Sequence, residues 1–241
     1  MEGTIQNSIE ENREIKKGGL NLGQLKWIAM ATMLIDHIGA IILMPLLSKT
    51  PRGSAIREIY TITRVIGRTA FPKFCFALAE GYNHTRNKYK YLIRLLIFAI
   101  ISEIPFDYAN SGKFFNWEYQ NVLFTLSIGL IAMILIDLPK KGVLINLLIV
   151  YGAMALAQYM YTDYGPWGVA NILLFKYIRL DRTGRALANS AINIYQGNFG
   201  TNFSSIALYY YNGDKGYNPK WFYLFYPVHQ IIYALIRDAL I

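Results

Sequence analysis

The feature that most constrains this sequence is a succession of apolar stretches, each about as long as a membrane-spanning helix. A bilayer core of about 30 Å needs about 20 mostly apolar residues in a helix. Cutting the chain at its charged and Pro/Gly clusters leaves eight such stretches: residues 25–46, 59–83, 90–109, 119–138, 142–161, 165–180, 186–211 and 219–239. The sequence therefore predicts an all-α, polytopic membrane protein with about eight transmembrane helices.

Composition supports this class of protein. Hydrophobic residues make up 54% of the chain, charged residues only 16%, and the 15% of aromatic residues suits helices anchored at the headgroup level. The formal net charge of +9 suits a cytoplasmic face against anionic lipid. A nucleic-acid-binding role needs a soluble basic face, which this chain lacks, so we expect a lipid bilayer and no nucleic acid among its partners.

The seventh stretch is the least secure of the eight, because asparagine and glutamine dilute it and only 206–211 is strongly apolar. The diluting residues are Asn189, Asn193, Gln196, Asn198 and Asn202. A half-helix, or a helix that lines a polar cavity, is the alternative to a full crossing, since polar backbone at membrane depth is tolerated only in such places.

The distribution of Lys and Arg predicts the orientation. More of these residues precede span one and follow spans two, four and six than lie on the other side, and the side with more Lys and Arg is the cytoplasmic one. An even number of spans then places both termini in the cytoplasm. Residues 1–20 are polar, have no apolar signal-peptide core and are expected to form a cytoplasmic tail, whereas 21–241 form a single transmembrane domain.

Ionisable residues inside the predicted spans are the most informative functional signal, because each is costly in a membrane and is by default a functional-site hypothesis. They are Asp36, His37, Arg64, Arg68, Lys73, Glu80, Arg94, Glu103, Asp107 and His229.

Predicted depth singles out the two histidines of spans one and eight. His37 follows Lys26 by eleven residues, about 16 Å of helix, and His229 follows Lys220 by nine, about 13 Å, so both lie near the midplane. Asp36 points about 100° away from its neighbour His37, which makes it a poor partner for that ring. It can instead pair with an arginine of span two.

Two further patterns bear on span two. Arg64 and Arg68 lie four residues apart and share one helical face, and so do Glu80 and His84 at the predicted cytoplasmic end of the span. The three histidines of the chain lie at different predicted depths, and the lone Cys75 reads as a small buried hydrophobe. We therefore expect no metal site.

Eight short motifs, taken together and in order, resemble the motif series of the TraX family. They are LIDHIGA at 34–40, RVIGRTAFP at 64–72, EGYNHTRN at 80–87, SEIPFD at 102–107, NVLFT at 121–125, DYG at 163–165, YNG at 211–213 and YPVH at 226–229. The resemblance covers about residues 25 to 235.

This resemblance implies an integral-membrane acetyltransferase of the bacterial cytoplasmic membrane. The TraX family is known for acetylating the N-terminus of conjugative pilin, and it resembles a wider superfamily of membrane acyltransferases that use cytoplasmic acetyl-CoA. The implied donor is acetyl-CoA. The implied acceptor is an amine of a peptide or pilin, or a hydroxyl group such as one on a glycan.

Acyl transfer from a thioester needs a base, donors for the developing oxyanion, and cations for the phosphates of coenzyme A. His37 is the leading base or a transient acetyl carrier, since a buried imidazole without a charged partner stays neutral. The other residues expected at the catalytic site are Asp36, Arg64, Arg68, Glu80 and His229. The residues expected to bind coenzyme A are Lys26, His84, Arg86, Arg94, Lys176, Arg179 and Arg182.

Other interpretations stay open at this stage. Charges at the midplane also suit a proton-coupled transporter, and a non-catalytic assembly factor for a pilus or surface peptide fits the same membrane topology. Arg64 and Arg68 can form a purely structural ion-pair network with Asp36 and Glu103. The basic run after span six can serve topology alone. Release of free thiol from acetyl-CoA separates the enzyme from both alternatives.

Overall fold

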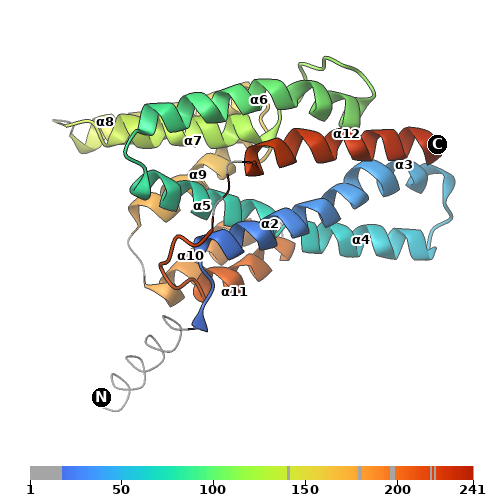
Figure 1. The fold of residues 1–241 in the computed structure, drawn as a ribbon, viewed down its shortest axis with the longest axis horizontal. Coiled ribbons are helices and arrows are strands. Elements are labelled where there is room, and N and C mark those ends of the chain that lie inside the picture. Colours follow the sequence, from blue (N-terminus) through green and yellow to red (C-terminus); the bar gives the residue numbers. More distant parts are fainter. Residues whose placement is uncertain are drawn as a thin grey trace, which may run out of the picture.

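The computed structural model of the protein describes residues 18–139, 142–178, 181–195, 199–217, 219 and 221–240, and these are helices joined by loops (Figure 1). The elements are α2 (Leu22–His37), η1 (Ile38–Leu43), α3 (Met44–Leu46), η2 (Leu47–Lys49), α4 (Ala55–Gly67), α5 (Ala70–His84), α6 (Lys88–Ser111), α7 (Val122–Ile136), α8 (Val143–Tyr159), α9 (Gly165–Tyr177), α10 (Arg182–Tyr195), η3 (Phe199–Phe203), α11 (Ser204–Tyr209) and α12 (Phe222–Leu240). The predicted all-α fold is confirmed. The predicted tail lies outside the described residues, apart from 18–20.

The first predicted span is one uninterrupted helical rod from α2 to η2. It begins with Asn21 as its N-cap. The Asn21 side chain accepts a hydrogen bond from the backbone N–H of Gln24, and the backbone N–H of Asn21 donates to the Gln24 side chain. This reciprocal cap satisfies two backbone donors that a helix start leaves free. Within the described residues, this rod is the one helix long and apolar enough to cross a membrane by length and composition, and α7 and α8 are shorter apolar helices.

The second predicted span is broken into α4 and α5 at Arg68 and Thr69. Pro72 explains the break, because proline has no N–H to donate to the carbonyl of residue 68 and its ring clashes with that carbonyl. Thr69 partly repairs the gap, since its hydroxyl donates to the carbonyl of Ile66 at 2.7 Å. The interruption lies halfway along the molecule, at the level of the two span-two arginines.

The seventh predicted span is a hairpin. α10 runs inward, η3 turns the chain, and α11 runs back, so that Asn212 donates a backbone hydrogen bond to the Leu20 carbonyl and Leu22 donates one to the Asp214 carbonyl beside the start of α2. At its turn, a Cβ on Gly200 would lie 2.6 Å from the Val65 carbonyl oxygen, so only glycine fits against α4 there. The prediction of one continuous helix over 186–211 is therefore wrong, because the chain turns back between α10 and α11.

Because the hairpin returns to where it started, the last helix runs in the opposite direction to the one predicted. α12 begins where α2 begins, with the Trp27 and Phe222 ring centroids 5.1 Å apart. It ends where α6 ends, since Arg237 donates to the carbonyls of Tyr108 and Ala109. The described start and end of the chain therefore lie at opposite ends of the bundle, and the prediction that placed both termini on one side is wrong.

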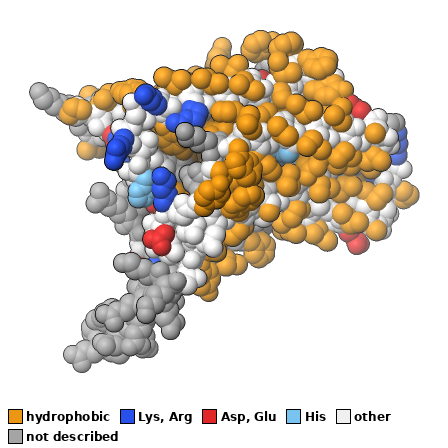
Figure 2. All heavy atoms as spheres, viewed as in Figure 1, with side chains coloured by type: hydrophobic (Ala, Val, Ile, Leu, Met, Phe, Trp, Pro, Cys, Tyr) orange, Lys and Arg blue, Asp and Glu red, His pale blue; other side chains and the backbone are white. Residues whose placement is uncertain are grey.

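We call the end at which α2, α6 and α12 begin the basic end. Its described basic side chains are Lys26, Arg86, Lys88, Lys90, Lys176, Arg182, Arg185 and Lys215. Figure 2 shows Lys and Arg side chains gathered at that end and hydrophobic side chains covering most of the remaining face.

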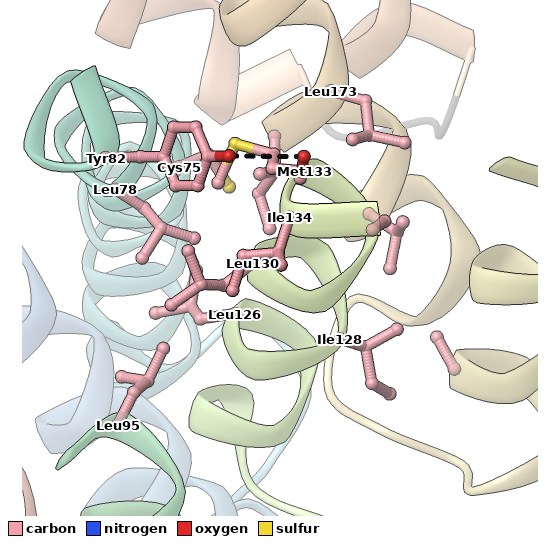
Figure 3. Close-up of a cluster of buried hydrophobic side chains, with 14 of the residues drawn as sticks. Cys75, Leu78, Tyr82, Leu95, Leu126, Ile128, Leu130, Met133, Ile134 and Leu173 are labelled. Atoms are coloured by element: carbon pink, nitrogen blue, oxygen red, sulfur yellow. Dashed lines mark hydrogen bonds between the residues drawn. The ribbon is translucent and has the colours of Figure 1, made fainter. Parts of the chain in front are cut away.

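The main hydrophobic core lies between α5, α7 and α9 (Figure 3). Cys75 and Met133 are fully buried in it, and the Tyr82 hydroxyl donates to the Met133 carbonyl at 3.3 Å. Cys75 is thus a buried small side chain, as predicted. This core fixes α5, which carries one wall of the site described next.

Candidate functional site

Two histidines from opposite ends of the sequence meet inside the bundle. His37 ends α2, directly before the π-helical segment η1, and His229 lies about two turns beyond the start of α12. Their nitrogens, Nδ1 of His37 and Nε2 of His229, are 2.8 Å apart. His229 is almost completely buried. The sequence analysis placed both histidines near the midplane, and the structure adds that they contact each other.

A backbone carbonyl determines which nitrogens carry protons. Nδ1 of His229 lies 2.7 Å from the Phe225 carbonyl oxygen, which can only accept a hydrogen bond. That nitrogen must therefore be protonated, and in a neutral ring Nε2 then has the lone pair. Nε2 of His229 therefore accepts a hydrogen bond from Nδ1 of His37. The lone pair of the neutral His37 ring is then on its Nε2.

Gln230 closes this chain of contacts. Its amide nitrogen lies 3.3 Å from Nε2 of His37, and the residue is fully buried. The sequence analysis missed Gln230, although it directly follows His229 in the chain. The available signal was a glutamine directly after a histidine in a predicted membrane-spanning helix.

Asp36 pairs with Arg64, one of the two arginines predicted as its partner. The Arg64 guanidinium donates to the Asp36 carboxylate at 2.8 Å and to its backbone carbonyl at 3.2 Å. α2 and α4 approach so closely here that a Cβ on Gly67 would lie 2.2 Å from the Cβ of Asp36. Small residues at a helix crossing allow such an approach. The second carboxylate oxygen of Asp36 is buried without a hydrogen-bond partner.

Arg68 has a different neighbour from the one predicted. Its guanidinium carbon lies 5.5 Å from the ring centroid of Tyr164, which in turn stacks on Phe71 with centroids 3.7 Å apart. Tyr164 has a φ of 62°, an uncommon left-handed conformation outside glycine. The preceding residue, Asp163, accepts a hydrogen bond from the Tyr119 hydroxyl. The sequence analysis named 163–165 only within the motif series and did not place it at the site.

These side chains surround a small cavity of about 40 Å³. Its polar lining comes from Asp36, His37, Asp163, Tyr164 and Tyr226, and its apolar lining from Met33, Gly67, Ala70, Phe71, Phe74 and Val122. Glu103, the other predicted ionic partner, does not line it and instead accepts hydrogen bonds from the backbone and side chain of Asn121.

A second cavity of about 180 Å³ adjoins the first and extends to the basic end. Met33, Phe74, Val122 and Tyr226 line both cavities. The lining of the larger one is mostly apolar and aromatic, and its two charged side chains, Lys26 and Arg94, come from the second turns of α2 and α6. Arg94 also lies over the ring of Tyr223. Both cations were predicted to bind coenzyme A.

The remaining predicted residues lie at the basic end and line neither cavity. His84 lies 3.7 Å from Glu80, which also accepts a hydrogen bond from Tyr211, and Lys176 donates to Asn83. Glu80 is thus not part of the cluster around His37. It lies on α5 more than two turns beyond Phe71, which lines the small cavity, and toward the basic end. Arg86 is exposed in the loop before α6, and Arg182 begins α10. Arg179 lies outside the described residues.

Among the described residues, no group of three or more His, Cys, Asp or Glu side chains is arranged to hold a metal ion. His84 lies apart from the pair formed by His37 and His229, at the basic end with Glu80. The three histidines are therefore divided between two places in the fold.

Comparison with known proteins agrees with this arrangement. The family model described as "TraX protein" matches residues 21–237, which include every side chain of the two cavities. The chain belongs to the TraX family. It is also 29% identical over 235 residues to the "Probable fimbrial assembly protein FimC, serogroup H1" of Dichelobacter nodosus, with 86% of this chain and 91% of that protein covered. No solved structure gives a significant match.

Proposed function

We propose that this TraX-family protein is a multi-pass acetyltransferase of the bacterial cytoplasmic membrane. Rows of exposed apolar side chains along four helices support membrane embedding, because a soluble monomer rarely exposes such surfaces. On α4, α6, α8 and α12 they include Ile59, Ile62, Ile66, Ile93, Ile97, Ile100, Ile104, Leu144, Leu147, Leu148, Val228, Ile231, Ile232 and Leu235. The described helices then make seven crossings and one re-entrant hairpin, with the basic end in the cytoplasm.

The larger cavity suits the pantetheine arm of acetyl-CoA entering from the cytoplasm. Taking about 10–15 Å³ for each water-sized group, a cavity of about 180 Å³ holds about 12–18 groups, close to the number of non-hydrogen atoms in pantetheine. Its lining suits the largely uncharged arm. Lys26 and Arg94 stand where the arm meets the phosphates, which cations bind well.

The smaller cavity suits the acetyl group. By the same measure its volume of about 40 Å³ holds about three groups, the number of non-hydrogen atoms in acetyl. The thioester carbonyl then lies beside His37 and Tyr226, and the two span-two arginines stand behind the lining residues Asp36 and Tyr164, which they contact. Positive charge and hydroxyl donors there stabilise the oxyanion that forms when the acceptor attacks.

The chemistry assigned to the site is a direct transfer with His37 as base. The acceptor nucleophile loses its proton to Nε2 of His37 and forms a bond to the acetyl carbon, and the carbon–sulfur bond of the thioester breaks. The departing thiolate takes the proton back from His37. Products are the acetylated acceptor and free coenzyme A, so atoms and charge balance.

The acceptor we propose is the N-terminal amine of a pilin or related surface peptide, with a glycan hydroxyl as the second choice. Support comes from the family and from the relative that is named as a fimbrial assembly protein. The two carboxylates that line the smaller cavity, Asp36 and Asp163, suit an amine that arrives as a cation. Such an amine first releases one proton to solvent, and the neutral amine then attacks and gives its second proton to His37.

The observation that carries the proposal is the paired histidine at the inner end of a cavity that opens at the basic end. Purified protein incubated with acetyl-CoA and an acceptor peptide should release free thiol. His37→Ala should reduce that rate by about 10²–10⁴-fold, the usual cost of losing a general base. The variant should still gain thermal stability from coenzyme A, because its cation-lined cavity is intact.

Gln158→Ala provides a matched control, since this residue is exposed on α8 and lines neither cavity. It should release thiol at the wild-type rate. Thermal stabilisation by coenzyme A with no thiol release from any acceptor would favour the non-catalytic assembly factor. Absence of both effects, together with substrate-driven proton uptake in vesicles, would favour a transporter.

A further inference from the structure

We infer that Gln230 is a positioning residue whose amide holds His37 in both protonation states of the histidine pair. The inference rests on the proposed role of His37 as the base. The three side chains form a single chain of contacts, from the Phe225 carbonyl through His229 and His37 to the Gln230 amide.

The two atoms of the Gln230 amide have unequal surroundings. Its nitrogen faces the lone pair on Nε2 of His37 at 3.3 Å, while its oxygen is buried without a hydrogen-bond partner. A buried acceptor without a partner is costly and rare in native proteins. An amide needs only to turn over to present that oxygen in place of the nitrogen.

Proton uptake supplies the partner that the oxygen lacks. When Nε2 of His37 takes a proton from the acceptor, its N–H bond forms, and the proton on Nδ1 can pass to Nε2 of His229. His37 is then neutral with its proton on Nε2, and His229 is the cation, with one proton held by the Phe225 carbonyl. Nε2 of His37 is now a donor, and the turned amide of Gln230 accepts from it through its oxygen.

The position of Gln230 on α12 makes this arrangement possible. Consecutive helical residues point about 100° apart, so His229 and Gln230 reach the two nitrogens of one imidazole from the same helix. The contact of 3.3 Å is longer than the 2.8 Å between the histidines, and it is therefore the one that yields when an acceptor approaches Nε2.

Other ionisable groups surround His37 from each neighbouring element, and they remain unchanged in the Gln230 variants below. They are Asp36 on its own helix, His229 and Tyr226 on α12, Arg64 on α4 with Arg68 at its end, and Asp163 and Tyr164 in the loop before α9.

Two substitutions of Gln230 test the inference by turnover. Gln230→Met keeps the length of the side chain but can no longer donate, so kcat for thiol release should fall by about 100-fold, as expected for a mispositioned base. KM for acetyl-CoA should stay within about twofold. Gln230→Glu offers a permanent acceptor that favours the charged histidine pair, so the acid limb of the pH–kcat profile should move to higher pH.

Nitrogen-15 NMR of labelled histidine provides a readout that does not depend on turnover. The chain has only three histidines, and His37→Ala and His229→Ala assign their signals. The wild type at neutral pH should show His37 protonated on Nδ1, and Gln230→Met should alter the Nε2 signal of His37 most. Ile231→Ala, at the next and outward-facing position of α12, should change neither spectrum nor kinetics.

The two proposals fail in different ways. If the wild-type protein releases no thiol, the proposed function fails, and the NMR spectra alone decide on Gln230. Near-native kcat in Gln230→Met, an acid limb unmoved in Gln230→Glu, or His37 protonated on Nε2 in the neutral wild type would each overturn the positioning role. Should Gln230→Met fail to fold, the acid limb of Gln230→Glu and the wild-type spectrum still decide.

Discussion

At the scale of single residues, the pair formed by Asp36 and Arg64 shows how function and stability share the same atoms. Arg64 donates both to the Asp36 carboxylate and to its backbone carbonyl, and so it ties α4 to the last turn of α2, next to His37. A part-buried carboxylate that loses its cation is strongly destabilising. The arginine is also one of the cations proposed to stabilise the oxyanion.

Substituting both partners separates these two roles. Arg64→Met should lower the free energy of unfolding by about 3 kcal/mol, because it leaves Asp36 charged and unpaired. Adding Asp36→Asn should recover most of that stability, yet thiol release should stay low, since the oxyanion has lost a cation. Thermal unfolding in detergent and the thiol assay measure the two effects. A double variant that regains both stability and turnover would make the pair purely structural.

At the scale of secondary-structure elements, the α10–α11 hairpin is held by polar groups where a spanning helix would carry apolar ones. The Asn189 amide donates to the hydroxyls of both Ser204 and Ser205, and Asn193 donates back to the carbonyl of Asn189. The Asn-rich composition that weakened the seventh stretch is therefore the cause of the hairpin. The chain turns back after the 14 residues of α10 and continues through η3 into α11.

A second junction between elements lies at the basic end, where Asp137 follows α7. Its carboxylate accepts hydrogen bonds from Tyr82 of α5 and Tyr177 of α9, and it lies 3.3 Å from the Lys88 ammonium of α6. Burial opposes ionisation of this carboxylate, but the hydrogen bonds from the tyrosines and the charges of the lysines outweigh it, so the pKa of Asp137 is held below its ordinary value.

Acid should therefore weaken this junction. A carboxyl whose pKa is lower in the folded state stabilises the fold above its unfolded pKa of about 3.9, and that contribution is lost as pH falls through the folded value. Asp137→Asn should lower Tm by a few degrees at pH 7, with a smaller difference below about pH 4. The effect is modest because the side chain is partly exposed and screened. An equal deficit at all pH values would contradict the ionic contribution.

At the scale of the whole molecule, the hairpin reverses the direction of everything that follows it. The predicted topology placed Lys215 outside and Arg237 inside, whereas the structure places Lys215 at the basic end and Arg237 at the opposite end. These two residues exchange places, so between them they leave the charge bias unchanged. A count of Lys and Arg cannot distinguish eight crossings from seven crossings and a hairpin.

Reporter fusions distinguish the two topologies directly. With the basic end in the cytoplasm, a reporter fused after Ile241 should be active only on the outer side of the membrane. A cysteine at Lys113 should react with an impermeant reagent in intact cells, and one at Asp214 should react only after permeabilisation. Background labelling of the native cysteine should be low, because Cys75 is fully buried. A cytoplasmic C-terminal reporter with Asp214 labelled from outside would restore the eight-span arrangement.

The sequence by itself determined the helical class, the limits of most helices and several ionisable residues of the candidate site. These properties follow from local patterns: apolar length, proline and capping positions, and the cost of charge in an apolar segment. The expectation that Asp36 pairs with an arginine of span two, and not with His37, also followed from helical spacing alone. Lys26 and Arg94 were named as candidate cations only after the family resemblance had implied a coenzyme A donor.

Only the tertiary structure decided how these residues meet. The contact between His37 and His229 joins positions 192 residues apart. The proposed role of Gln230 depends on the Phe225 carbonyl, which faces His229 and fixes the position of its proton. Tyr164 and Asp163 reach the site through a loop whose sequence reads as a simple turn. The direction of α12 depended on whether one weakly apolar stretch crosses or returns. Packing and hydrogen bonding between distant segments settle such questions, and no local pattern records them.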